Sequence, residues 1–126
     1  MSPPRVLIVD DDASVRGLYD AYLTGVGCEV ETARDGAEAI EKAEAVAPDV
    51  IVMDLDMPKV DGWAATTTLK RSSQTRHIPV IAMSGISDQA RRTAQRAGCD
   101  AFAAKPCLPD LLRWRIVAIL SKRRRA

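Results

Sequence analysis

The chain has 126 residues, of which 28% are charged and 47% are hydrophobic, and its formal net charge at pH 7 is +1. This composition is ordinary for a globular protein, and the length allows one domain with a buried core but not two. No apolar run approaches the roughly 20 residues of a membrane span, no signal peptide fits the N-terminus, and the three cysteines lack the spacing of a disulfide framework or a zinc site. We therefore expect a cytoplasmic protein with reduced cysteines and no membrane contact.

Short apolar segments rich in β-branched residues alternate five times with segments of helical periodicity. Strands are expected at Arg5–Asp10, Glu29–Ala33, Asp49–Asp54, Pro79–Met83 and Ala101–Ala104. Helices are expected from Asp12 or Ala13 to Gly25, from Gly36 to just before Pro48, and over Trp63–Arg71, Asp88–Ala97 and Pro109–Lys122. The crossovers have the length that right-handed βαβ units need. The sequence thus predicts an α/β fold: a (βα)5 doubly wound parallel five-stranded sheet, order 2-1-3-4-5, flavodoxin-like.

The first predicted helix carries an apolar stripe at i, i+3, i+4 spacing, formed by Val15, Leu18, Tyr19, Tyr22 and Leu23. Such a stripe predicts a helix face that packs on the domain. Trp63 is expected to pack its own helix on the domain. Trp114 lies off the apolar stripe of the last helix and is expected to be exposed.

Acidic residues follow the first and third predicted strands, as Asp10 and Asp11 and as Asp54 and Asp56. The carboxyl ends of parallel strands meet at one edge of the sheet, where open α/β folds place their sites. Carboxylates crowded there would repel one another unless a divalent cation or a lysine joined them. Mg²⁺ suits oxygen ligands, and Lys105, after the fifth strand, offers a point charge for a phosphoryl oxygen. The pattern indicates phosphoryl chemistry at an aspartate.

Several short features, in order on the matching elements, together carry a resemblance to a known family. They are Asp10-Asp11 after the first strand, Asp54-Leu55-Asp56-Met57-Pro58 with Asp61-Gly62 after the third, Ser84 after the fourth, Lys105-Pro106 after the fifth, and Phe102 three residues before that lysine. Over nearly its whole length the chain resembles the receiver domains of two-component response regulators, in particular single-domain regulators of the chemotaxis type. The resemblance implies a receiver domain over residues 1–121 and a basic C-terminal tail over residues 122–126.

The resemblance also implies a chemical role for each acid. Asp54 would accept a phosphoryl group from a sensor histidine kinase or a histidine phosphotransfer protein, in a reaction that depends on Mg²⁺ or Mn²⁺. Asp11 and Asp54 would ligate the metal, Asp10 would reach it through water, and Asp56 would contribute its backbone carbonyl. Asp54 is a carboxylate nucleophile, so it needs no general base.

Lys105 and Ser84 would complete the catalytic set. Lys105 would neutralise charge on the phosphoryl oxygens, while Ser84 would shift to donate a hydrogen bond and Phe102 would fill the space it leaves. This switch would change the face of the fourth helix, fifth strand and fifth helix, and so control a downstream protein or a homodimer. The chain would not be a conventional enzyme, because it would catalyse its own phosphorylation and slow dephosphorylation. No DNA-binding domain is expected in it.

Each of these residues also has a plain structural interpretation. Acids after a strand can cap a helix, and Asp12 is assigned that role. Asp54, Asp56 and Ser84 can be turn residues. A lysine before a proline can be a solvated loop residue, and the phenylalanine can be a packing residue.

Two other functions fit part of the pattern. Asp54 and Asp56 after an apolar strand also match the strand–DxD signature of haloacid-dehalogenase-like phosphatases, although that family has Thr or Val where Met57 stands. Turnover of p-nitrophenyl phosphate would distinguish the two, since a receiver is modified once. Flavin or nucleotide binding is the other alternative, but a Gly-rich phosphate loop is missing after the first strand.

Charge is distributed unevenly along the chain. Residues 113–126 hold six basic and no acidic residues, which leaves 12 basic and 17 acidic residues, a net charge of −5, in residues 1–112. The basic end could touch nucleic acid or anionic lipid, or be a solvated tail that complements the helix dipole.

Asp56 and Ile86 flank the approach of a hydrolytic water in the family, and we expect the apolar Ile86 to slow dephosphorylation.

Overall fold

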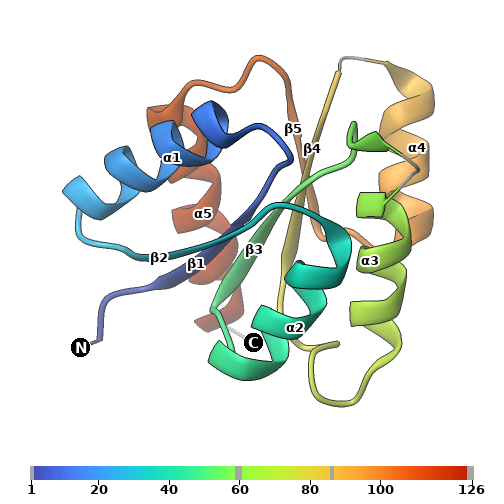
Figure 1. Cartoon of the computed structure of the whole chain (residues 1–126), viewed down its shortest axis with the longest axis horizontal. Helices are drawn as coiled ribbons and strands as arrows, with labels where there is room; N and C mark the ends of the chain where they lie inside the picture. Colours follow the sequence, from blue (N-terminus) through green and yellow to red (C-terminus); the bar gives the residue numbers. More distant parts are fainter. Residues whose placement is uncertain (1, 59–60, 86, 125–126) are drawn as a thin grey trace.

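The structure is a computed structural model that describes residues 2–58, 61–85 and 87–124 (Figure 1). Its strands are β1 (Arg5–Val9), β2 (Glu29–Ala33), β3 (Val50–Asp54), β4 (Val80–Ser84) and β5 (Ala101–Ala104). Its helices are α1 (Ala13–Gly25), α2 (Gly36–Val46), α3 (Asp61–Arg71), α4 (Asp88–Ala97) and α5 (Pro109–Arg124). All neighbouring strands pair in parallel, in the order β2-β1-β3-β4-β5. The predicted fold class and strand order are confirmed.

The central strands form because their sequences are almost entirely apolar. All residues of β3 and β4 are buried, as are four of the five in β1, which is the pattern of parallel strands covered on both faces. The edge strand β2 is different, because Glu29 and Glu31 alternate with Val30 and Thr32 and most of the strand is half-buried. Alternation of polar and apolar residues is typical of a strand with one face partly exposed.

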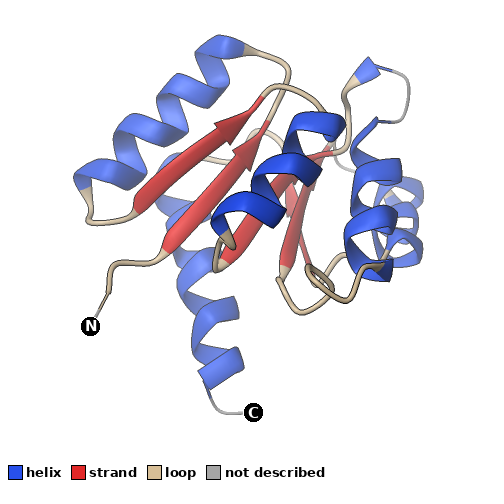
Figure 2. Ribbon diagram, turned by 60° about the horizontal axis from the view of Figure 1, so that its bottom comes forward, coloured by secondary structure: helices blue, strands red, loops and turns tan. Residues whose placement is uncertain are grey.

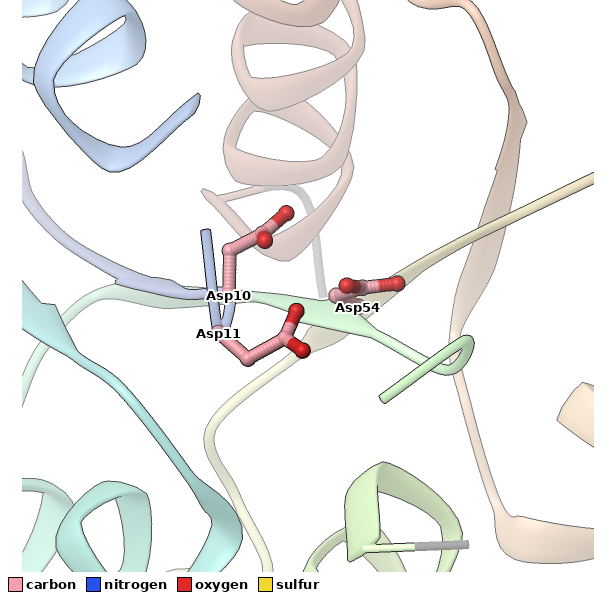
Figure 3. Close-up of side chains that lie close together, drawn as sticks. All are labelled: Asp10, Asp11 and Asp54. Atoms are coloured by element: carbon pink, nitrogen blue, oxygen red, sulfur yellow. The ribbon is translucent and has the colours of Figure 1, made fainter. Parts of the chain in front are cut away.

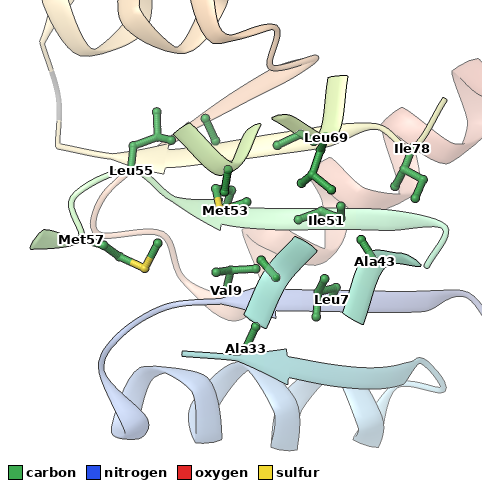
Figure 4. Packing of buried hydrophobic residues seen from close by; sticks show 14 of the residues in the cluster. Leu7, Val9, Ala33, Ala43, Ile51, Met53, Leu55, Met57, Leu69 and Ile78 are labelled. Carbon is green, nitrogen blue, oxygen red and sulfur yellow. The ribbon is translucent and has the colours of Figure 1, made fainter. Parts of the chain in front are cut away.

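Helices cover both faces of the sheet (Figure 2). Each face has its own apolar layer. The layer under α2, α3 and α4 joins their alanines and Leu69 to one set of strand residues, Leu7, Val9, Ile51 and Met53 (Figure 4). The layer under α1 and α5 contains Tyr19, Leu23, Leu112 and Ile116, with Val6, Ile8, Val50 and Val52 of the strands. Successive strand residues point to opposite faces, so β1 and β3 supply both layers.

The expectations about helix faces are confirmed except at one residue of the α1 stripe, whose members Val15, Tyr19, Tyr22 and Leu23 pack as predicted. Trp63 packs against the layer under α2, α3 and α4, and Trp114 is exposed. The expectation that Leu18 belongs to the packed stripe of α1 is wrong, since its side chain is 56% exposed. The reason is that α1 contacts the domain along Tyr19 and Leu23, and successive residues on a helix are about 100° apart.

Two helices are longer than the sequence indicates. α3 begins at Asp61 rather than Trp63, and α5 continues to Arg124 rather than ending at Lys122. The end of α5 is tied to the sheet, because Arg123 Nη1 donates a hydrogen bond to the Asp49 backbone carbonyl at 3.2 Å. Within the described part of the chain, none of the helices combines the length and the apolar character that crossing a membrane requires.

Side-chain hydrogen bonds hold the loops at the carboxyl edge of the sheet. Asp12 caps α1 by accepting from the backbone N–H of Ser14 at 2.8 Å, as predicted for this residue. The Asp61 carboxylate accepts from the backbone N–H of Gly36 at 2.8 Å and so joins the start of α3 to the start of α2. These bonds satisfy helix N–H groups that otherwise lack a partner.

Candidate functional site

Three carboxylates meet at the carboxyl edge of the sheet (Figure 3). Asp10 and Asp11 directly follow β1, and Asp54 ends the neighbouring strand β3. Each side chain offers one oxygen, and these oxygens all lie within 4.8 Å of one another. Asp10 and Asp54 are only 5% and 3% exposed, whereas Asp11 is exposed. The structure thus brings together the three acids predicted to converge where the strand order reverses.

Hydrogen bonds fix the position of Asp10. Its backbone N–H donates to the carbonyl of Ala33 at 3.1 Å, which extends the contact between β1 and β2 by one residue. Its carboxylate accepts from the Asp12 backbone N–H at 2.9 Å. Arg16 of α1 donates from Nη1 to the Asp10 backbone carbonyl at 2.9 Å. Sequence reasoning missed Arg16, because an arginine in the first turns of a helix gives no signal of such a contact.

The acid cluster carries more negative charge than its neighbours neutralise. Burial, with a smaller contribution from the charges of Asp54 and Asp11, raises the pKa of Asp10 to about 6 from its ordinary value of 3.8. The hydrogen bond from the Asp12 N–H and the charge of Lys105 act in the opposite direction but do not offset the rise. The site therefore favours any group that brings positive charge into it.

Lys105 supplies the one ammonium that contacts this cluster among the described residues. Its Nζ lies 2.8 Å from Asp54 Oδ1 and 3.6 Å from Asp56 Oδ2, and its backbone N–H donates to the Ser84 carbonyl at 2.8 Å, just beyond β5. Burial alone would lower the pKa of Lys105, but the hydrogen bond to Asp54 and the nearby carboxylates raise it above its ordinary value. The side chain is thus held as a cation beside Asp54.

Ser84 and Asp56 make a contact that the sequence did not indicate. Ser84 Oγ donates a hydrogen bond to Asp56 Oδ1 at 2.6 Å, and the Gly85 backbone N–H donates to Asp56 Oδ2 at 3.1 Å. The Asp56 backbone N–H in turn donates to Asp54 Oδ1 at 2.8 Å. The Asp56 side chain, which the resemblance gives no ligand role, therefore links the β3–α3 loop to the end of β4.

Phe102 lies on β5, half-buried and packed against the apolar layer under α2, α3 and α4. The Arg91 guanidinium of α4 sits over its ring, 5.1 Å from the ring centroid, which is a cation–π distance. The predicted packing role of Phe102 is therefore present, and it is combined with a contact to α4. Ile86, expected to slow dephosphorylation, lies outside the described residues.

An apolar groove borders the site between α1 and the loop that follows β5. Its walls include Val15, Leu18, Cys107, Leu108 and Pro109, and its floor reaches Asp54 and Lys105. Tyr19 of α1 holds the two walls together by donating from its hydroxyl to the Cys107 carbonyl at 2.6 Å. The groove leaves the buried carboxylates accessible from one side.

The sequence model of the response regulator receiver domain family matches residues 6–117, most of the chain. The chain belongs to this family. The resemblance carried by the acids, Ser84, Phe102 and Lys105 is thereby confirmed at the level of the family, and the chain is a receiver domain of two-component signalling.

Curated relatives cover nearly the whole receiver domain. The transcriptional regulatory protein PrrA of Mycobacterium leprae is 40% identical over 98% of this chain and 52% of its own length. The probable transcriptional regulator ycf27 of Guillardia theta is 37% identical over 97% of this chain and 47% of its own length. The chain spans about half the length of the curated relatives it matches.

Solved structures agree with the fold and bear on the site. The chemotaxis protein CheY4 of Vibrio cholerae has a TM-score of 0.88 at 30% identity, over 94% of this chain and 99% of that one. The receiver domain of the sensor histidine kinase PA1611 from Pseudomonas aeruginosa has a TM-score of 0.86 at 27% identity, over 95% and 99% of the two chains. That structure holds a magnesium ion in its active site cleft. The phosphatase alternative through Asp54 and Asp56 is not favoured by these matches.

Proposed function

We propose that this receiver domain accepts a phosphoryl group on Asp54 from the phosphohistidine of a sensor histidine kinase or a histidine phosphotransfer protein. The observation that carries the proposal is the contact of Lys105 Nζ with Asp54 Oδ1 at 2.8 Å. This contact lies in a cluster in which carboxylate oxygens of Asp10, Asp11 and Asp54 are all within 4.8 Å of one another. The apolar groove gives a donor histidine access to this buried carboxylate. The proposed nucleophile, the lysine cation and the two neighbouring acids thus line one accessible pocket.

The donor set fits a magnesium ion. All the candidate ligands are oxygens, which hard divalent cations prefer, and among the described residues the three carboxylates of the cluster are contacted by a single ammonium, that of Lys105. Asp11 and Asp54 would hold the ion directly, Asp10 through water, and Asp56 through its backbone carbonyl. When bound, the ion supplies positive charge to the oxygens of the phosphoryl group. Mn²⁺ has the same ligand preference and would substitute.

The transfer itself requires little of the protein beyond position and charge. A carboxylate oxygen of Asp54 forms a bond to phosphorus while the phosphorus–nitrogen bond of the phosphohistidine breaks, and its electron pair returns to the imidazole. Asp54 loses no proton, so no general base is needed. Lys105 stabilises the charge on the transferring group, because its ammonium is already fixed 2.8 Å from Asp54. The product is an aspartyl phosphate, which the chain later hydrolyses slowly.

The phosphodonor would dock over the apolar groove. Leu18 and Leu108 are 56% and 61% exposed on its two walls, and apolar side chains beside a buried reactive group are suited to a protein partner. A donor that covered both walls would bring its histidine over Asp54 and exclude water. We therefore assign the groove to the histidine kinase or phosphotransfer protein.

The output would come from Ser84, Phe102 and the α4–β5–α5 face. Phe102 contacts Arg91 on α4, so a shift of the Phe102 ring would change its contact with that helix. Trp114 of α5 is exposed on the neighbouring element, and aromatic and arginine side chains are common in interfaces. Phosphorylation would change how this face binds a downstream protein or a second copy of the chain.

We also propose the cytoplasm as the site of action and residues 1–121 as the receiver unit, with a basic segment over residues 122–126. The cysteines at 28, 99 and 107 are free, as expected in a reducing compartment. The family match ends at residue 117, inside α5. The basic segment, which starts at Lys122, thus lies beyond the end of the family match.

Incubation with acetyl phosphate tests the proposal. With Mg²⁺ present, intact mass spectrometry should show one added phosphoryl group, which is absent after chelation and absent in Asp54→Asn. A parallel assay with p-nitrophenyl phosphate should show no turnover. A phosphoryl group that persists in Asp54→Asn, or steady turnover of the phosphate ester, would refute the assignment.

A further inference from the structure

The Asp56 carboxylate is held by donors from two other loops. Ser84 Oγ donates to one oxygen at 2.6 Å, and the Gly85 N–H donates to the other at 3.1 Å. Lys105 Nζ lies 3.6 Å from that second oxygen. Ser84 is only 4% exposed, so its hydroxyl depends on Asp56 rather than on bulk water for an acceptor.

These are donors that an anionic group on Asp54 would also use. Lys105 Nζ contacts Asp54 and Asp56 together, and the Asp56 backbone N–H is bonded to Asp54 Oδ1. The two carboxylates therefore share the same cation. A serine hydroxyl has one proton and can donate it to one strong acceptor at a time, so the Asp56 carboxylate and a phosphoryl oxygen exclude each other at Ser84.

We propose that the Asp56 side chain is a tethered competitor of the phosphoryl group. In the unphosphorylated chain its carboxylate holds Ser84 and the Gly85 N–H, and phosphorylation of Asp54 displaces it. This inference rests on the proposed function of Asp54. It makes Asp56 a positioning residue, acting through Ser84 and Lys105, in addition to any role of its backbone carbonyl.

Displacement is feasible because Asp56 is only partly enclosed. Its side chain is 44% exposed, so the released carboxylate can turn into water and recover hydration. The Ser84 hydroxyl, which is buried, then has the phosphoryl oxygen as its acceptor. Removal of the competing carboxylate should therefore strengthen the binding of a phosphoryl mimic, and by more than the loss of one nearby charge would explain.

Beryllofluoride titration with Mg²⁺, followed by the ¹H–¹⁵N NMR resonance of the Gly85 amide, tests this. We expect Asp56→Ala to bind beryllofluoride more tightly than the wild type by roughly tenfold or more, the size of one charge-assisted hydrogen bond. The gain should largely disappear when Asp56→Ala is combined with Ser84→Ala. Asp12→Asn removes one charge beside the site while keeping the helix cap, and it should have little effect.

The Gly85 amide gives a readout that needs no bound group. In the absence of beryllofluoride its resonance should shift in Asp56→Ala, and by less in Asp56→Asn, which keeps an acceptor oxygen. An unchanged Gly85 resonance in Asp56→Ala would overturn the proposal. Unchanged beryllofluoride affinity in Asp56→Ala would also overturn it. An equal gain in affinity from Asp56→Ala in the Ser84→Ala background would overturn it as well, because such a gain would come from the removal of a negative charge alone. Wild-type protein that fails to bind beryllofluoride would instead contradict the proposed function of Asp54, and this inference with it.

Discussion

A Cβ atom at position 62 would lie 2.3 Å from the backbone carbonyl oxygen of Asp54, so Gly62 allows α3 to begin directly against the end of β3. The residue before it, Asp61, ties the same helix start to Gly36. The strand end that carries the proposed phosphoacceptor is therefore packed under a helix that tolerates no side chain at its second position.

Gly62→Ala should lower the free energy of unfolding by about 2 kcal/mol or more, because the contact is with backbone that cannot turn away. Urea denaturation measures this. Gly17→Ala is the matched control, since Gly17 lies in the same kind of helix with nothing within 4 Å of an added Cβ, and it should raise stability by up to about 1 kcal/mol. Equal effects of the two substitutions would show that α3 does not pack on β3 in this way.

Asp10→Asn should stabilise the metal-free protein. Burial and the neighbouring carboxylates disfavour the charged form of Asp10, while an asparagine keeps the oxygen that accepts from the Asp12 N–H. We expect a gain of about 1–2 kcal/mol near neutral pH, visible as a melting temperature higher by several degrees. Added Mg²⁺ should stabilise the wild type more than the variant, and a variant that melts below the metal-free wild type would contradict the electrostatic explanation.

The same group makes stability depend on pH in a definite direction. The pKa of Asp10 is about 6 in the folded chain and 3.8 ordinarily, so the folded state binds the proton more tightly than the unfolded state does. The contribution of Asp10 is therefore favourable at low pH and is lost as the pH rises from about 4 to 6. The difference in melting temperature between Asp10→Asn and the wild type should grow across that range, and a constant difference would refute the raised pKa.

Leu18→Asp should slow phosphorylation by a histidine phosphodonor protein by about tenfold or more, the effect of losing a central interface contact. It should leave phosphorylation by acetyl phosphate nearly unchanged, because that donor is too small to need the wall of the groove. Val26→Asp is the control, since Val26 is also exposed but follows the other end of α1. Competition assays that follow labelled phosphate from donor to chain would decide this, and equal loss with both donors would point to a damaged site instead.

The sheet and the acid cluster could be predicted because they follow from local patterns. Apolar runs such as Val50–Asp54 give buried parallel strands, and the strand order alone brings Asp10 and Asp54 to one edge. What could not be predicted depends on how separate loops meet. The bond from Ser84 to Asp56 joins residues 28 apart in sequence, and no propensity or spacing encodes it.

The two expectations that the structure corrects, for Leu18 and for the end of α5, also concern contacts between separate parts of the chain. Leu18 fits the apolar spacing of α1, but a helix on the surface of a domain buries only the side that a neighbour covers, here along Tyr19 and Leu23. Near the end of α5, Arg123 donates a hydrogen bond to the Asp49 carbonyl, a contact that charge patterns do not reveal. In both places a tertiary contact is present that no local pattern encodes.

Chemical identification of the phosphorylated residue tests the central claim most directly. The chain would be phosphorylated with a small phosphodonor and Mg²⁺, then treated with borohydride, which reduces an aspartyl phosphate to homoserine at the modified position, and its peptides would be sequenced by mass spectrometry. We predict homoserine at position 54 and at none of the other acids of the site. Homoserine at Asp10, Asp11 or Asp56 with an intact Asp54 would contradict the assignment.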